Sequence, residues 1–279
     1  MALMAAWLRR AGAALLVDRG RSLVTAGIGQ PAAVHALVHR INGALGNTGT
    51  TVVHTAPVPV PGAESLSALT EAMAGGRVGT LLMLGVNPVY EVPGELAFAE
   101  HLARVPFKIH AGTYFDETAA HADWHLPLAH PLESWGDARS LDGTVGLIQP
   151  TVAPLYGGRS AQEILTLFGA EIPAQEGPEQ GLALLKRQWR GPGEDAAAFE
   201  ARFAEALRLG FLPDTALPVE TVVPGGQAVA ASSAPSRTPA TEDRIEAVFR
   251  PDPCVWDGAS ADLGWLQELP KPLTKGVRS

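Results

Sequence analysis

Residues 80–128 constrain the fold more than any other stretch, because three short apolar runs alternate there with helical sequence. The expected strands cover residues 80–86, 107–111 and 124–128. A helix is expected between the first two strands, at residues 94–104, and another between the last two, starting at Asp116-Glu117-Thr118. Asn87-Pro88 ends the first run, as expected where a strand enters a turn. Buried strands that alternate with helices are typical of a βαβαβ unit with a parallel sheet.

Ligands of such sheets bind at the carboxyl ends of the strands. In this chain those ends are predicted at Gly85-Val86-Asn87-Pro88 and at Gly112-Thr113. A binding site, if the chain has one, is therefore expected to include these two turns.

The rest of the chain adds helices and short strands. We expect helices at residues 1–19, 31–45, 64–74, 160–168, 181–189 and 195–208, and strands at 22–26, 51–55, 144–149 and 245–250. Ser160 followed three residues later by Glu163 predicts a capping box. The fold class that follows is α/β, a Rossmann-like and mostly parallel sheet flanked by helices, with an irregular C-terminal extension.

A change of composition suggests how the chain divides. Residues 212–244 are rich in proline, alanine and serine, carry few charges and lack periodicity, which favours a linker. We therefore expect an α/β domain at residues 1–211, this linker, and at 245–279 the start of a connection to a further domain.

Composition excludes several classes of function. The net charge of −8 argues against nucleic-acid binding, which needs a basic surface. The single cysteine, Cys254, cannot form an internal disulfide or supply the four ligands of an iron–sulfur cluster. No apolar stretch reaches the ~18 residues of a membrane span. Arg9-Arg10 before a short apolar run is compatible with a twin-arginine or secretory signal, although an amphipathic helix is favoured.

Local motifs for catalysis or metal binding are weak. Gly27-Ile28-Gly29 can cradle a phosphate, but without the full dinucleotide fingerprint a tight turn is favoured. His35 and His39 lack a third ligand, and a helix surface is expected. We expect structural or surface roles for the histidines at 110, 121, 125 and 130, with a proton-accepting histidine near a quinol as the alternative. The carboxylates of Glu133 and Asp137 are expected to cap backbone amides. We predict no catalytic residue and no metal site.

The central block also carries a set of residues in a recognisable order: Gly85, Asn87, Pro88, Glu117, Thr118, Ala119, Ala122, Asp123, Leu126, Pro127, Glu133, Gly136 and Gly143. In these residues it resembles the molybdopterin oxidoreductases that use a bis-guanine-dinucleotide cofactor. Residues 124–127 and 133–139 look most similar to the molybdopterin-oxidoreductase-like iron–sulfur subunit of alternative complex III, a bacterial quinol-oxidising complex. The resemblance covers most of this chain but only the middle of a family member, so a split gene or a fragment is expected.

The resemblance implies cofactor contacts that this sequence partly lacks. Gly85, Asn87, Pro88, Glu117, Thr118 and Asp123 would line half of a pterin guanine-dinucleotide site. Gly112 replaces an acidic residue of the family, Asp137 replaces a threonine, and Thr144 replaces an arginine. Loss of an arginine fork removes a bidentate anion contact, and an added carboxylate repels phosphate. We therefore expect a relic of the site.

The resulting expectation is a non-catalytic scaffold domain in a quinol-oxidising complex that resembles alternative complex III, with no cofactor in this chain. Its expected partners are an iron–sulfur domain, a haem c subunit and a quinol-binding membrane subunit, at the periplasmic face of the cytoplasmic membrane. The alternative is part of an active molybdenum oxidoreductase of the polysulfide or thiosulfate reductase type, with molybdopterin guanine dinucleotide bound. A third possibility is a free-standing nucleotide-binding domain that uses Gly27 and Gly29.

Overall fold

The computed structural model describes residues 2–60, 62, 64–169 and 179–222, and in the C-terminal segment residues 252, 254, 255, 258 and 261–271. The chain divides into two compact units, of which the first includes residues 2–58 and 217–222 and the second includes residues 59–216 and the described part of the C-terminal segment. The domain boundaries expected at residues 211 and 244 remain predictions. The strand expected at 245–250 lies outside the described residues.

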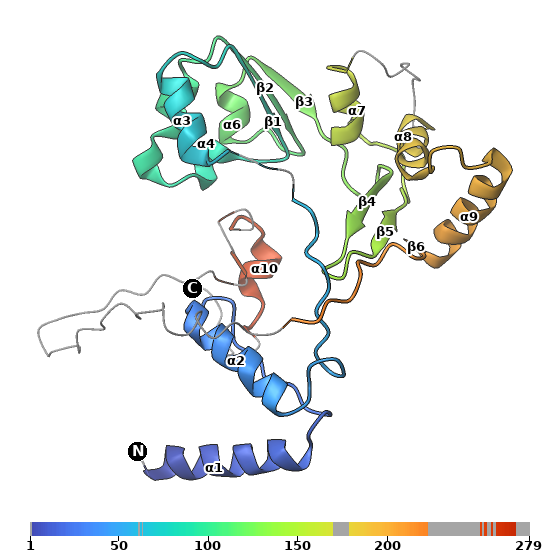
Figure 1. Ribbon diagram of the computed structural model, residues 1–279. Helices are drawn as coiled ribbons and strands as arrows, with labels where there is room; N and C mark the ends of the chain where they lie inside the picture. The colour runs from blue at the N-terminus through green and yellow to red at the C-terminus, as the bar shows by residue number, and fades with distance from the viewer. Residues whose placement is uncertain are drawn as a thin grey trace, which may run out of the picture. The chain divides into compact units, whose positions relative to one another are not determined.

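The first unit contains two helices joined by extended chain, and both helices confirm the sequence-based expectation. They are α1 (Ala2–Val17) and α2 (Ala32–Ala44), shown in blue in Figure 1. The strand expected at 22–26 does not form: the side chain of Asn42 in α2 bonds both the backbone N–H and the C=O of Val24, at 3.1 and 2.8 Å. The strand expected at 51–55 is reduced to single bridges at Val52 and Thr55. β-branched residues favour a strand only where a neighbouring strand pairs with them.

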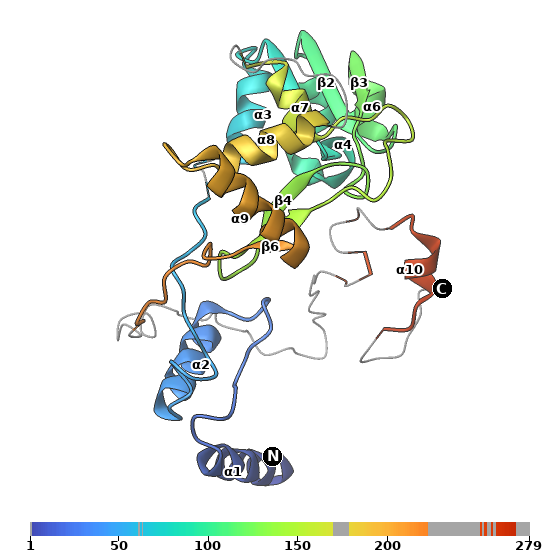
Figure 2. The same ribbon diagram turned by 90° about the vertical axis from the view of Figure 1, so that its right-hand side faces the viewer.

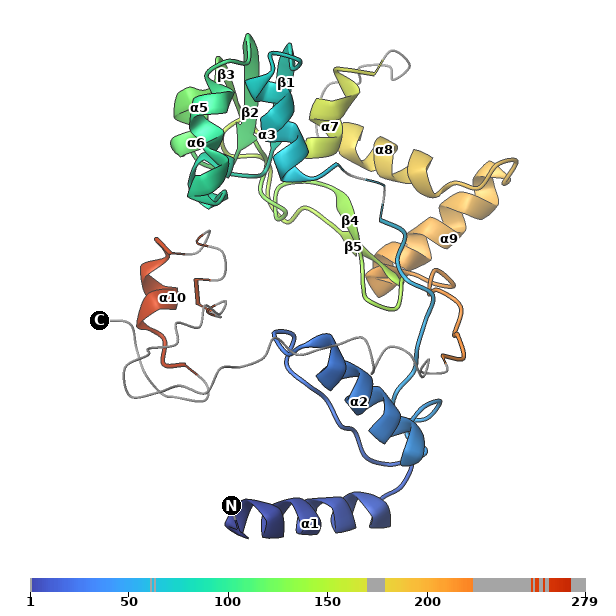
Figure 3. The ribbon, with the colours of Figure 1, turned by 60° about the vertical axis from the view of Figure 1, so that its left-hand side comes forward.

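A parallel sheet flanked by helices forms the first half of the second unit, which confirms the α/β fold class (Figures 1 and 3). The strands, in spatial order, are β1 (Thr80–Leu84), β2 (Phe107–Gly112) and β3 (Trp124–Pro127). The flanking helices are α3 (Leu66–Ala74), α4 (Pro88–Glu91), α5 (Phe98–Leu102) and α6 (Glu117–His121). All three expected strands are therefore confirmed within a residue or two.

The helix expected at 94–104 is broken in two. A 3₁₀ turn, η1 (Gly94–Leu96), precedes α5, and Ala97 between them has a φ of 43°. A left-handed residue cannot continue an α-helix, so the chain restarts there. Phe98 and Leu102 still reach the core, which they share with Met73, Met83 and Val105.

The second unit also contains an antiparallel sheet, of which the sequence predicts only one strand. It consists of β4 (Gly136–Arg139), β5 (Val145–Ile148) and β6 (Phe211–Leu212), in the order β4-β5-β6. Helices α8 (Glu179–Trp189) and α9 (Ala196–Leu209) lie beside this sheet in Figure 2. Phe199, Phe203, Leu185, Val145 and Leu212 form the shared core. The expected strand at 144–149 thus exists as β5, but it does not extend the parallel sheet.

Two shorter helices complete the second unit. Helix α7 (Ala161–Thr166) begins with the predicted capping box between Ser160 and Glu163. Helix α10 (Gly264–Glu268) lies in the C-terminal segment. None of the helices in the described part of the chain is both long and apolar enough to cross a membrane.

Candidate functional site

A cavity of about 490 Å³ lies at the carboxyl ends of β1 and β2, where a ligand of a parallel sheet is expected. Its described lining consists of Gly85, Val86, Asn87, Tyr90, Glu91, His110, Gly112, Thr113, Tyr114, Asp116, Glu117, Leu128, Gly258, Ala261 and Asp262. Gly85 has a φ of 64°, so the turn after β1 needs the freedom of a glycine. The two turns predicted from the sequence therefore meet at one cavity.

The side chain of Asn87 links the turn after β1 to helix α6. Its amide nitrogen donates to Glu117 Oε2 at 2.7 Å, and its Oδ1 accepts hydrogen bonds from the backbone N–H and the hydroxyl of Thr118, at 3.2 and 2.7 Å. The buried Thr118 hydroxyl in turn accepts the N–H of Val89 in α4 at 3.0 Å. Asn87 thus uses its carbonyl oxygen and one amide hydrogen within the protein.

Glu117 and Pro88 also have local structural roles. The pKa of Glu117 is lowered, mainly by the hydrogen bond from Asn87 and to a smaller extent by a backbone hydrogen bond, so this exposed carboxylate stays ionised. Pro88 is buried and occupies the first turn of α4, where a missing N–H costs nothing. Gly85, Asn87, Pro88, Glu117 and Thr118 are therefore brought together as expected.

Asp123 lies apart from that cluster. It precedes β3, and its Oδ2 accepts the backbone N–H of Lys108 at 2.7 Å and lies 3.0 Å from Lys108 Nζ. These contacts lower the pKa of Asp123, with the backbone hydrogen bond as the largest cause. Because Lys108 stands near the start of β2, Asp123 is at the amino end of the sheet, away from the cavity.

Two histidines form a hydrogen-bonded pair beside the cavity. His110 is fully buried, its Nδ1 lies 3.0 Å from Nδ1 of His125, and its Nε2 lies 3.1 Å from the carbonyl oxygen of Val86. Since a carbonyl only accepts, Nε2 of His110 carries a hydrogen, and one hydrogen is shared between the two Nδ1 atoms. Burial, and then the nearby His110, lower the pKa of His125.

The buried His110 ring also explains Gly112. A Cβ built on Gly112 would lie 2.6 Å from Cε1 of His110, which is closer than carbon atoms approach one another. The acidic side chain that the family carries at this position is therefore incompatible with His110 in its present place. The sequence shows the glycine but not its contact with the ring of the histidine two residues earlier.

The charge of the cavity does not suit a guanine dinucleotide. Four carboxylates line its described part, those of Glu91, Asp116, Glu117 and Asp262, and no lysine or arginine is among the described lining residues. The pyrophosphate of a dinucleotide is anionic and is held in proteins by basic side chains or free backbone N–H groups. The residues present thus do not fit the cofactor that the resemblance implies.

The other two departures from the family pattern have structural roles. Asp137 in β4 accepts the indole N–H of Trp189 in α8 at 2.7 Å, so the expectation that it caps a backbone amide is wrong. The Arg139 guanidinium stacks over the same indole ring at 5.3 Å. Thr144 donates its backbone N–H to Asp142 Oδ1 at 2.9 Å and so closes the β4–β5 turn. The hydrogen bonds of both residues are therefore made within the protein, where they stabilise the second sheet.

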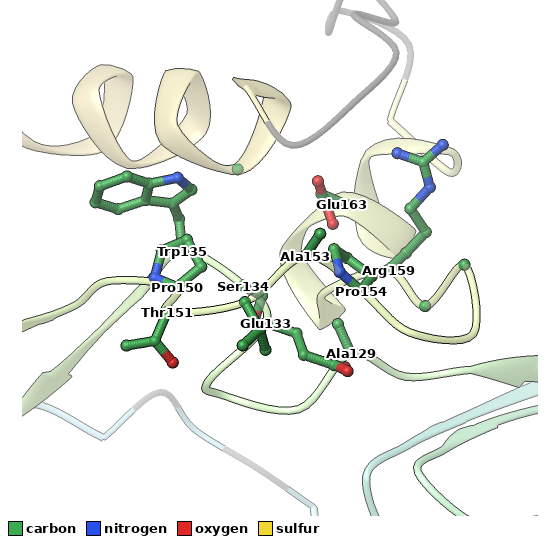
Figure 4. Close-up of a pocket in the computed structure, with 14 residues that line it drawn as sticks. Ala129, Glu133, Ser134, Trp135, Pro150, Thr151, Ala153, Pro154, Arg159 and Glu163 are labelled. Carbon is green, nitrogen blue, oxygen red and sulfur yellow. The ribbon is translucent and has the colours of Figure 1, made fainter.

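A second cavity, of about 480 Å³, was not predicted from the sequence. The loops at 129–135 and 150–159 and the start of α7 surround it, and Figure 4 shows the Trp135 ring and the Arg159 side chain at opposite ends. Glu133 accepts the backbone N–H groups of His130 and Leu155, which confirms its expected capping role and lowers its pKa. The only signal in the sequence was the proline- and glycine-rich stretch 150–158.

The remaining candidate motifs can also be placed. Gln30 N–H bonds the Gly27 carbonyl at 3.0 Å, which confirms a tight turn. His39 packs against His54 with ring centroids 5.4 Å apart. Among the residues that the structure describes, no group of three or more histidine, cysteine, aspartate or glutamate side chains is placed to hold a metal ion.

Comparison with known proteins gives one informative relative. No protein-family model matches the chain. The molybdopterin-binding-like subunit of menaquinone reductase from Nitratidesulfovibrio vulgaris is 29% identical over 164 residues, which cover 54% of this chain and 24% of that protein. The match thus spans about a quarter of the length of the curated relative. The similarity agrees with the resemblance of the central block to the molybdopterin oxidoreductases.

Proposed function

We propose that this chain is a cofactor-free, molybdopterin-oxidoreductase-like scaffold domain of a quinone-linked respiratory complex similar to alternative complex III. The observation that carries the proposal is the charge of the cavity at the end of the parallel sheet. Four acidic residues and no described basic residue line the cavity where an anionic dinucleotide would bind, and Asn87 is already hydrogen-bonded to Glu117 and Thr118. In such a site a pyrophosphate would meet repulsion without a compensating cation.

The scaffold role assigns electron transfer to other polypeptides. The one cysteine, Cys254, cannot hold an iron–sulfur cluster, so clusters and haems would belong to partner chains or domains. The relative is by name a subunit of a menaquinone reductase, which supports partners that exchange electrons with a quinone. We propose an iron–sulfur domain, a haem c subunit and a quinol-binding membrane subunit, assembled at the periplasmic face of the cytoplasmic membrane.

Purification of the tagged chain from its native host tests the assembly. The complex is expected to contain iron and haem and to oxidise a quinol, while the chain separated from its partners contains neither metal group. The scaffold role would be contradicted if the chain purified alone under mild conditions, both from host membranes and from the soluble extract, with no associated iron or haem.

The alternative function is half of an active molybdenum site of the polysulfide or thiosulfate reductase type. The observation in its favour is that Gly85, Asn87 and Glu117 converge on one cavity at the carboxyl ends of the strands. If this alternative held, molybdopterin guanine dinucleotide would bind there and bring molybdenum redox chemistry. The absence of a described basic residue from the lining favours the scaffold.

A further inference from the structure

The first helix of the chain exposes an apolar face. Met4, Trp7 and Leu8 in α1 are 69%, 66% and 57% exposed. With the half-buried Leu15 they follow the i, i+3, i+4 and i+11 spacing of one helix face. An exposed tryptophan beside two long aliphatic side chains is unfavourable in water, so this face needs an apolar surrounding.

The sequence that carries this face is basic. Residues 1–63 contain five arginines and a single acidic residue, Asp18, whereas residues 64–279 contain 28 acidic and 16 basic residues. Arg9 and Arg10 project from the middle of α1, are exposed, and have no acidic partner among the described residues. Asp18 is paired with Arg21 at 3.1 Å. A basic segment on an otherwise acidic chain indicates a surface that binds an anionic partner.

We propose that α1 binds the surface of an anionic phospholipid bilayer, with Met4, Trp7 and Leu8 at the boundary of headgroups and acyl chains. Arg9 and Arg10 then contact lipid phosphates, and the Trp7 indole occupies the interfacial layer that tryptophan favours. Charge complementarity selects this occupant over a neutral apolar surface. The inference deepens the proposed peripheral position at a membrane and rests on it, since it identifies the element that makes the contact.

Vesicle sedimentation of the full chain tests this contact. The probes are vesicles of equal parts phosphatidylglycerol and phosphatidylcholine, and vesicles of phosphatidylcholine alone. Binding is expected to the anionic vesicles, to fall as the salt concentration rises, and to be at least tenfold weaker on the neutral vesicles. Equal binding to both vesicles would overturn the anionic-lipid proposal.

Two leucine variants provide a matched comparison. Leu8→Glu places a charge on the apolar face of α1 and is expected to reduce binding more than tenfold. Leu37→Glu changes an equally exposed leucine in α2, 53% exposed, by the same chemistry, and is expected to leave binding unchanged. Because both sites are exposed, neither variant is expected to disturb folding, which circular dichroism checks.

The charge contribution is tested separately. The double variant Arg9→Gln, Arg10→Gln is expected to weaken binding to the anionic vesicles by roughly 30-fold, which corresponds to about 1 kcal/mol per arginine. An effect of Leu37→Glu as large as that of Leu8→Glu would refute the assignment to α1. Absence of vesicle binding would also overturn the inference and assign the face to a protein partner. The cofactor content of the chain is measured in a separate experiment. A negative result with vesicles therefore refutes only the lipid contact and does not decide whether the chain is a cofactor-free scaffold.

Discussion

Replacement of Asn87 by alanine separates a structural from a ligand-binding role of the candidate site. In the folded protein Asn87 Oδ1 is the acceptor for two donors of Thr118, a residue whose side chain is completely buried. The substitution leaves both donors without that acceptor. At about 1 kcal/mol for each lost hydrogen bond, Asn87→Ala is expected to lower the free energy of unfolding by about 2 kcal/mol.

For a unit of this size the loss corresponds to a melting temperature lower by roughly 4–8 °C, measured by circular dichroism or calorimetry. Thr113→Ala serves as the matched control. Thr113 lines the same cavity, is exposed, and its side chain makes no hydrogen bond among the described residues, so the melting temperature should change by less than about 2 °C. Equal and negligible shifts for both variants would refute the structural role of Asn87.

The pH dependence gives this prediction a second readout. The Asn87 hydrogen bond lowers the pKa of Glu117 in the folded state below the ordinary value of a glutamate side chain. When folding lowers the pKa of an acid, the ionised acid stabilises the folded state at pH values above its unfolded-state pKa. This contribution is lost as the pH falls through the folded-state pKa. The difference between wild type and Asn87→Ala should therefore be larger at pH 7 than at pH 3. A difference that grows on acidification would contradict the assigned contact.

Three further predictions concern other parts of the chain. Phe203→Ala should lower the free energy of unfolding in urea by about 3–5 kcal/mol because Phe203 is 1% exposed in the core of the second sheet, and a loss below about 1 kcal/mol would contradict that packing. Ser160→Ala should cost about 1 kcal/mol through loss of the cap on Glu163 N–H, whereas an unchanged urea midpoint would argue against the capping box. By NMR, His125 should titrate with a pKa below that of an exposed histidine. Stability should therefore rise with pH between the folded-state and unfolded-state pKa values, and His125→Phe should flatten this rise. A pKa above that of an exposed histidine would exclude the pair that His125 forms with the buried His110.

The parallel sheet could be predicted because its signals are local. Each strand is a short apolar run ended by Asn-Pro, glycine or proline, and helical sequence separates the runs. Asp116 caps α6 and Ser160 caps α7 as those patterns suggest. The elements that depend on distant partners could not be predicted in this way. Strand β4, with the sequence Gly-Asp-Ala-Arg, has no apolar pattern and forms because β5 pairs with it.

The same distinction applies to the candidate site. Gly85, Asn87 and Glu117 could be placed together because parallel strands bring their carboxyl ends to one edge of the sheet. Asp123 could not, because its contact with Lys108 depends on the register of β2 against β3. The sequence also could not predict that acidic residues line the cavity, because Glu91, Asp116 and Asp262 are far apart along the chain.

Analysis of bound metal and nucleotide tests the central claim most directly. The full chain, produced in a host that makes the bis-guanine-dinucleotide cofactor, is purified and analysed for molybdenum, tungsten and acid-released guanine nucleotide. The cofactor-free scaffold predicts none of the three above background. Stoichiometric molybdenum or tungsten together with guanine nucleotide would contradict it and would make Asn87 and Glu117 cofactor contacts.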